Sequence, residues 1–152
     1  TFEIIGSGSD LNYMIEYSNK KNVSNHFNFH GRVQESTLIN IMKNVHFCVQ
    51  PDPFNPLNNV STMNKLMEYM AMKKTFVSYD LIESRYSGLN SGLFSKVNDS
   101  KSYAKDIVRL CRNTKLRESL SDNGYKRVVD LLQWPKQAES LIIAYQSIIN
   151  EK

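Results

Sequence analysis

The residues whose types and spacing suit chemistry are concentrated between positions 58 and 72, where a polar loop turns into a predicted helix. Ser61 and Thr62 are both good N-cap residues, so we expect the helix to begin there. The first amides of a helix are free and the helix dipole adds partial positive charge, so this end suits an anion such as a phosphate. The start of this helix is therefore the predicted position of a phosphate group.

A carboxylate follows two turns further along the same helix. Glu68 comes seven residues after Ser61, so the two lie nearly in line, about 10 Å apart along the axis, with Asn64 and Lys65 between them. A carboxylate at that position can accept hydrogen bonds from a sugar hydroxyl. The spacing fits a nucleoside diphosphate lying along the helix. An ordinary capped helix with a solvated polar edge explains the same residues, and that alternative stays open.

Other chemistry finds little support in the sequence. It contains no nucleophile elbow and no phosphate-binding loop that ends in Gly-Lys-Ser/Thr. Three histidines without ligand spacing predict no metal site. Glu83, after the fourth predicted strand, is a second candidate carboxylate, with a simple helix-start charge as the alternative. The Gly-Ser-Gly turn at 6–8 is a weak dinucleotide signal because it lacks the third glycine.

Composition narrows the class of protein. The chain has 152 residues, of which 41% are apolar and 22% charged, which is typical of one globular domain. A net charge of +4 without a basic stripe favours no nucleic-acid partner. No apolar run is long enough for a membrane span and no signal peptide is present, so we expect a cytoplasmic protein. Its two cysteines, Cys48 and Cys111, are then reduced thiols.

Hydrophobic patterning predicts five strands and six or seven helices. The strands are expected at 2–5, 27–30, 45–50, 75–79 and 93–97. The helices are expected at about 11–19, 34–44, 61–72, 100–111, 114–132 and from 134 onward, with 80–87 a loop or short helix and 54–60 a long loop. Alternating strands and helices predict a doubly wound parallel sheet, a Rossmann-like α/β fold closed by C-terminal helices.

Three segments of the chain resemble a known family. They are Phe-His-Gly-Arg-Val at 29–33, Phe-Cys-Val-Gln-Pro at 47–51 and Lys-Leu-Met-Glu-Tyr-Met-Ala-Met-Lys-Lys-Thr-Phe-Val-Ser at 65–78. This pattern resembles the C-terminal donor domain of the GT-B retaining glycosyltransferases, the large group-one family. Trp134 and Tyr145 are similar to the closing segment of that family.

The resemblance extends from position 6 to position 145 and implies roles for individual residues. A GT-B enzyme has two Rossmann-like domains, and the C-terminal one holds a nucleotide-diphosphate sugar. By this resemblance Glu68 binds the ribose hydroxyls. The backbone of Ser61, Thr62 and Met63 faces the diphosphate, near Asn64 and Lys65. The turn formed by Gly31, Arg32 and Val33 lines the base.

The sequence departs from the family pattern at several positions. The family commonly has a second glutamate eight positions before Glu68, where this chain has Val60. The contact to the donor sugar is therefore expected from Asn58, from Asn59 or from the loop backbone. Lys73 and Thr75 replace a usual glycine and proline. The first strand and the cationic clamp of the family are expected before position 6 and are not in this sequence.

We therefore expect residues 1–152 to be a single nucleotide-sugar-binding domain, a fragment of a longer chain that lacks the N-terminal acceptor domain. The full-length protein is expected to be a hexosyl or other glycosyl transferase in polysaccharide biosynthesis, and the isolated fragment inactive. Its partners are a nucleotide sugar and a glycan or lipid-linked acceptor, without metal or other cofactor, and peripheral membrane association of the full-length protein is left open. The alternatives are a non-catalytic Rossmann-like nucleotide- or protein-binding module and, less favoured, an NAD-type oxidoreductase.

Overall fold

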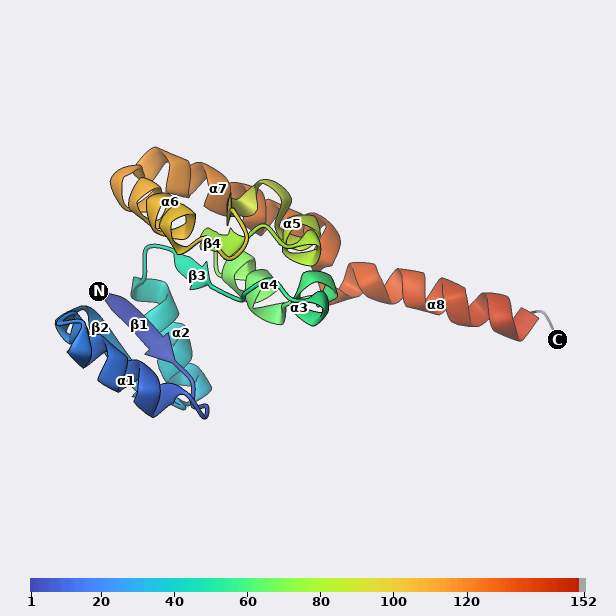
Figure 1. Ribbon diagram of the computed structural model, residues 1–152. Helices are drawn as coiled ribbons and strands as arrows, with labels where there is room; N and C mark the ends of the chain where they lie inside the picture. Colours follow the sequence, from blue (N-terminus) through green and yellow to red (C-terminus); the bar gives the residue numbers. More distant parts are fainter. Residues whose placement is uncertain (151–152) are drawn as a thin grey trace. The chain divides into compact units, whose positions relative to one another are not determined.

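The computed structural model describes residues 1–150 and divides into two compact units, one from Thr1 to Val45 and one beginning at His46 (Figure 1). We describe each unit by itself. The assignment of residues 1–152 to a single domain stays a prediction.

The first unit is a strand–helix–strand–helix segment. Its elements are β1 (Phe2–Ile5), α1 (Leu11–Lys20), the 3₁₀ turn η1 (Ser24–His26), β2 (Phe27–Gly31) and α2 (Glu35–Asn44). The two strands are parallel, with Phe2 opposite Phe27. Their rings stack 5.2 Å apart, which gives one face of this small sheet an aromatic core. The polar residues of the strands therefore lie on the other face.

The second unit contains the larger sheet. Its elements up to the last strand are β3 (Cys48–Gln50), α3 (Pro56–Val60), α4 (Asn64–Ala71), β4 (Phe76–Tyr79), α5 (Ile82–Gly88), the 3₁₀ turn η2 (Leu89–Ser91) and β5 (Gly92–Ser95). The helices that follow are α6 (Ser100–Arg112), α7 (Thr114–Arg127), the π-helical turn η3 (Val128–Leu132) and α8 (Trp134–Asn150). The strands are parallel in the order β3-β4-β5.

Helices cover both faces of the central strand β4, whose four residues are all buried. Val77 packs with Tyr103 and Leu110 of α6 on one face, and the Tyr103 hydroxyl donates to the Val77 carbonyl at 2.8 Å. Successive side chains of a strand alternate, so Phe76 points to the opposite face. Burial on both faces is the usual environment of a parallel strand, and it confirms the Rossmann-like α/β class.

The structure differs most from the sequence-based expectations in segments that contain polar residues or residues typical of turns. The expected loop at 54–60 contains a helix, α3, because Asn55 caps it by accepting from the Asn58 amide and Pro56 occupies its first turn. The segment at 80–87 is the helix α5. Of the helix predicted at 114–132, the part up to Arg127 is the α-helix α7, and the rest is the π-helical turn η3.

The last helix, α8, is formed as expected but has no buried residue. Its large apolar side chains are exposed, including Leu141, Tyr145 and Ile148. These three recur at intervals of four and three residues and therefore lie on one stripe of the helix.

Candidate functional site

The loops that leave the carboxyl ends of β3, β4 and β5 meet at one edge of the sheet in the second unit, where α/β folds bind ligands. Phe54, after β3, donates its amide to the Asn98 side chain, after β5, at 2.8 Å. The Asn98 side chain in turn donates to the Phe54 carbonyl at 3.4 Å. These hydrogen bonds join two loops that are 44 residues apart in sequence and shape this edge of the sheet.

The start of α4 differs from the prediction. Met63, not Ser61 or Thr62, is the N-cap, and no side chain caps the helix. The Ser61 hydroxyl donates instead to the Leu57 carbonyl in α3 at 2.7 Å, and the Thr62 hydroxyl donates to Glu83 Oε1 at 2.9 Å. Both hydroxyls are therefore engaged outside α4. Among residues 1–150 no side chain caps α4, and with the Leu66 amide bonded to the Met63 carbonyl, the amides of Asn64 and Lys65 remain able to bind an anion.

Two asparagines hold the segment that leads into α4. The Asn58 side chain donates to the Pro53 carbonyl at 2.9 Å. Asn59 Oδ1 accepts from the Ile82 amide, at the start of α5, at 3.1 Å. These contacts give both asparagines a role in shaping the loop, although the sequence suggested them as ligands of the donor sugar.

The polar residues of α4 have different environments. Lys65 Nζ lies 2.7 Å from Asp52 Oδ2, and both side chains are partly exposed. The Glu68 side chain is exposed, and within the described part of the chain no hydrogen bond or ion pair engages it. Asn64 is also exposed, at the first helical position. Burial raises the pKa of the neighbouring Tyr69, which keeps that phenol neutral.

The residues predicted to line the base lie in the first unit. Gly31 ends β2 with a φ of +64°, a conformation that favours glycine, and the Gly6 amide donates to its carbonyl at 2.8 Å. Arg32 is exposed and Val33 half-buried in the turn that follows. The structure thus groups residues 58–68 around α4, and it places 31–33 in a separate unit.

Sequence reasoning missed a polar cluster on β1 and β2. Glu3 accepts from the Asn28 side chain at 2.8 Å, and its other carboxylate oxygen lies 2.5 Å from His30 Nε2. The hydrogen bond from His30, then the one from Asn28, lowers the pKa of the Glu3 carboxyl. The alternation of polar and apolar residues in both strands is the signal that could have revealed this cluster.

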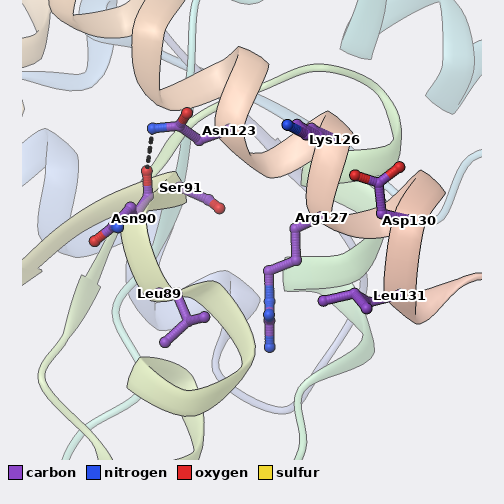
Figure 2. A pocket seen from close by; sticks show the side chains of 8 residues that line it. All are labelled: Leu89, Asn90, Ser91, Asn123, Lys126, Arg127, Asp130 and Leu131. Atoms are coloured by element: carbon purple, nitrogen blue, oxygen red, sulfur yellow. Dashed lines mark hydrogen bonds between the residues drawn. The ribbon is translucent and has the colours of Figure 1, made fainter.

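A hollow of about 270 Å³ lies elsewhere in the second unit (Figure 2). Residues of η2, of the end of α7 and of η3 line it, among them Lys126, Arg127 and Asp130. Arg127 donates to the carbonyls of Ser87 and Tyr86 at 2.9 and 3.0 Å. Because η2 precedes β5, this hollow lies at the amino ends of the strands, opposite the edge that carries the start of α4.

Residues 1–150 contain neither a metal-binding cluster nor a membrane-spanning helix. No group of three or more His, Cys, Asp or Glu side chains is arranged to hold a metal ion there. Among the same residues, no helix is both long and apolar enough to cross a membrane.

The arrangement of parallel strands and flanking helices is that of a Rossmann-like domain of the GT-B type. Residues 1–113 match the family described as Glycosyl transferases group 1, and the chain belongs to this family. No curated protein sequence matches the chain.

Several solved structures share the fold. A sucrose-phosphate synthase from Thermosynechococcus elongatus is 18% identical with a TM-score of 0.85, over 99% of this chain and 39% of that one. The S. aureus protein TarM, a mutant in complex with fondaparinux, α-GlcNAc-glycerol and UDP, is 16% identical with a TM-score of 0.80, over 99% and 29%. WaaG, a glycosyltransferase involved in lipopolysaccharide biosynthesis, is 13% identical with a TM-score of 0.71, over 92% and 37%. The chain thus spans about two fifths or less of these proteins, and the likeness at such identities concerns the fold.

Proposed function

We propose that this chain is the nucleotide-sugar-binding half of a glycosyltransferase that transfers the sugar to a glycan or glycolipid acceptor with retention of configuration. The observation that carries the proposal is the start of α4, where uncapped amides precede an exposed carboxylate, Glu68. The family to which the chain belongs supports the same reading. The acceptor would be bound by a part of the protein outside these 152 residues.

The diphosphate and the ribose of the donor each have a counterpart on α4. The first-turn amides, at Asn64 and Lys65, bind the diphosphate with the help of the helix dipole. Glu68 lies four residues beyond Asn64, about 6 Å along the axis, where its carboxylate accepts from the ribose hydroxyls. The proposal assigns binding of the base to Gly31, Arg32 and Val33 of the first unit.

Such a site needs little side-chain chemistry of its own. Transfer breaks the bond between the sugar and the diphosphate, so negative charge grows on the leaving phosphate oxygen. Amides and a cation aimed at that oxygen stabilise the transition state without having to reorganise. Lys65, one residue into the helix, is the cation nearest to the proposed diphosphate in sequence. The scheme requires no metal ion, and a cytoplasmic location belongs to the same proposal.

A thermal-shift titration tests the proposal directly. We would titrate the chain with UDP, GDP and ADP and with UDP-glucose, UDP-N-acetylglucosamine, GDP-mannose and ADP-glucose. A ligand that binds only the folded chain raises the unfolding midpoint with concentration. We expect the nucleotides of one base to stabilise the chain. In Glu68→Ala, about ten times more ligand should be needed for the same shift in the unfolding midpoint, because one hydrogen bond to a charged group is lost.

Glu118→Ala is the matched control, because Glu118 is an exposed glutamate on α7. It should unfold and bind like the unmodified chain. If no nucleotide stabilises the unmodified chain, or if both variants lose binding equally, the donor-site proposal is wrong.

The second candidate is a non-catalytic nucleotide-binding module. Val60 favours it, since this position is 66% exposed and carries no acid. Such a module would bind a nucleotide, yet the whole protein would release no nucleoside diphosphate when the nucleotide sugar and a glycan acceptor are supplied. Release of the diphosphate with formation of a glycosylated product would exclude it.

A further inference from the structure

Most carboxylates at the carboxyl edge of the larger sheet already have a partner. Asp52 forms the ion pair with Lys65 described above. Asp80 binds Arg85 through two parallel contacts of 2.8 and 2.7 Å. Asp99 caps α6 by accepting two backbone amides at 3.0 Å each. Asp52 and Asp80 are therefore each paired with a cation, and Asp99 caps a helix.

Among residues 1–150, Glu83 is paired with neither a cation nor a backbone amide, and hydroxyl groups are its partners. Its Oε1 accepts from the Thr62 hydroxyl at 2.9 Å and from the Ser87 hydroxyl at 3.1 Å. Within residues 1–150 no cation pairs with Glu83, and its second oxygen, Oε2, has no hydrogen-bond partner. The side chain is half-buried, so it is held in place while one acceptor oxygen remains available.

Two hydrogen bonds fix the start of α5 against the segment that leads into α4. The first is the one from Thr62 to Glu83, across 21 residues of sequence. The second joins the Ile82 amide to Asn59, across 23 residues. Since Thr62 is two residues before Asn64, where α4 begins, the Glu83 carboxylate lies beside the proposed diphosphate position.

We propose that Glu83 binds the hydroxyl groups of the donor sugar, a role that rests on the proposed function above. In a nucleotide sugar the ribose and the sugar lie on opposite sides of the diphosphate. Glu68 lies beyond the start of α4, where the ribose would be, whereas Thr62 and Glu83 lie before it. An ionised carboxylate only accepts hydrogen bonds, and a sugar hydroxyl can donate one to the free Oε2.

This assignment explains how the donor sugar is recognised although position 60, in the segment before α4, is a valine and not an acidic residue. The Val60 side chain supplies no acceptor, Asn58 Nδ2 donates to the Pro53 carbonyl, and Asn59 Oδ1 accepts from the Ile82 amide. A carboxylate from α5, brought to the same segment by tertiary contacts, takes over the recognition of the sugar.

The test compares binding of a nucleotide sugar with binding of the bare nucleotide by isothermal titration calorimetry. The variant is Glu83→Gln, whose amide oxygen still accepts from Thr62 and Ser87 while Oε2 becomes an NH₂ group. We expect the ratio of affinities, UDP-glucose over UDP or the matching pair for another base, to fall about tenfold or more, the usual effect of losing a hydrogen bond to a charged acceptor. Affinity for the bare nucleotide should not fall, because the change removes a negative charge near the diphosphate.

Glu118→Gln on α7 is the control for loss of a surface carboxylate, and it should leave both affinities unchanged. Unliganded unfolding midpoints verify that each variant folds. An unchanged affinity ratio in Glu83→Gln, with nucleotide binding intact, overturns the role of Glu83 and leaves the proposed function standing. Failure of the unmodified chain to bind any of the nucleotides overturns both.

Discussion

Lys65 Nζ lies 2.7 Å from Asp52 Oδ2, so an ion pair joins the first turn of α4 to the loop that leaves β3. The pair holds a cation next to the proposed diphosphate position but also neutralises part of its charge. Side-chain exposures of 39% and 26% mean that solvent screens the pair, so its contribution to stability is small.

This relationship gives a first prediction. Lys65→Met should weaken binding of the preferred nucleoside diphosphate about tenfold, because a cation near the phosphates is lost. Asp52→Asn should keep or strengthen binding, because it releases Lys65 to the ligand. Each change should alter the free energy of unfolding by less than about 1 kcal/mol. Titration calorimetry and urea unfolding measure these effects, and weaker binding in Asp52→Asn would contradict the assignment.

The close packing of Gly92, the first residue of β5, against Phe76 of β4 gives a second prediction. A Cβ added at Gly92 would lie 2.5 Å from the ring of Phe76 and 2.7 Å from its carbonyl oxygen. Phe76 is fully buried and the carbonyl belongs to the backbone, so neither can move aside easily. We expect Gly92→Ala to cost about 2 kcal/mol or more of unfolding free energy, measured by urea denaturation.

Two other glycines calibrate that effect. At Gly124 a Cβ would lie 2.9 Å from Cγ of Met70 and 3.1 Å from Cβ of Ser91, longer contacts than at Gly92 and with no backbone atom among them, so a smaller loss is expected there. At Gly8 nothing lies within 4 Å, and Gly8→Ala should be neutral. Equal stability of the Gly92 and Gly8 variants would contradict the packing described.

The polar cluster on β1 and β2 gives a pH-dependent prediction. The hydrogen bonds from His30 and Asn28 hold the pKa of Glu3 below its usual value of 4.5. A depressed pKa in the folded state stabilises the fold above the usual value, and this stabilisation is lost as the pH falls through the folded-state pKa. The stability difference between the unmodified chain and Glu3→Gln should therefore be present above the usual pKa of 4.5 and should shrink as the pH falls below that value.

Thermal unfolding across that pH range measures the difference. Glu16→Gln, which changes an exposed glutamate of α1 outside the cluster, is the control. A constant difference between the unmodified chain and Glu3→Gln at all pH values would contradict the prediction.

The two thiols should react at very different rates. Burial raises the pKa of the Cys48 thiol to about 12, so almost no thiolate forms and reagents reach it poorly. Cys111 is exposed on α6. With a disulfide reagent at about pH 8 we expect one thiol to react rapidly in the native chain, and none to react rapidly in Cys111→Ser. Rapid reaction in that variant would show that Cys48 is accessible.

Sequence alone was enough to predict the elements that depend on local patterns. The periodicity around Leu66 and Met70 predicted α4, and both side chains are fully buried. The run of β-forming residues at 75–79 predicted β4, whose four residues are all buried. These predictions succeed because periodicity records which side of an element faces the core.

Predictions that depended on the partner of a hydroxyl or carboxylate did not follow from the sequence. Thr62 has the properties of an N-cap, yet its hydroxyl binds Glu83, and Ser61 turns back to α3. Glu83 had a helix-start charge as its simpler explanation, and its contacts with Thr62 and Ser87 emerge only from the structure. The sequence by itself determined the parallel α/β class and the helix that carries Glu68. Tertiary structure decided which polar groups are committed to the fold and which remain available, because hydrogen bonds between distant segments leave no periodic trace in the sequence.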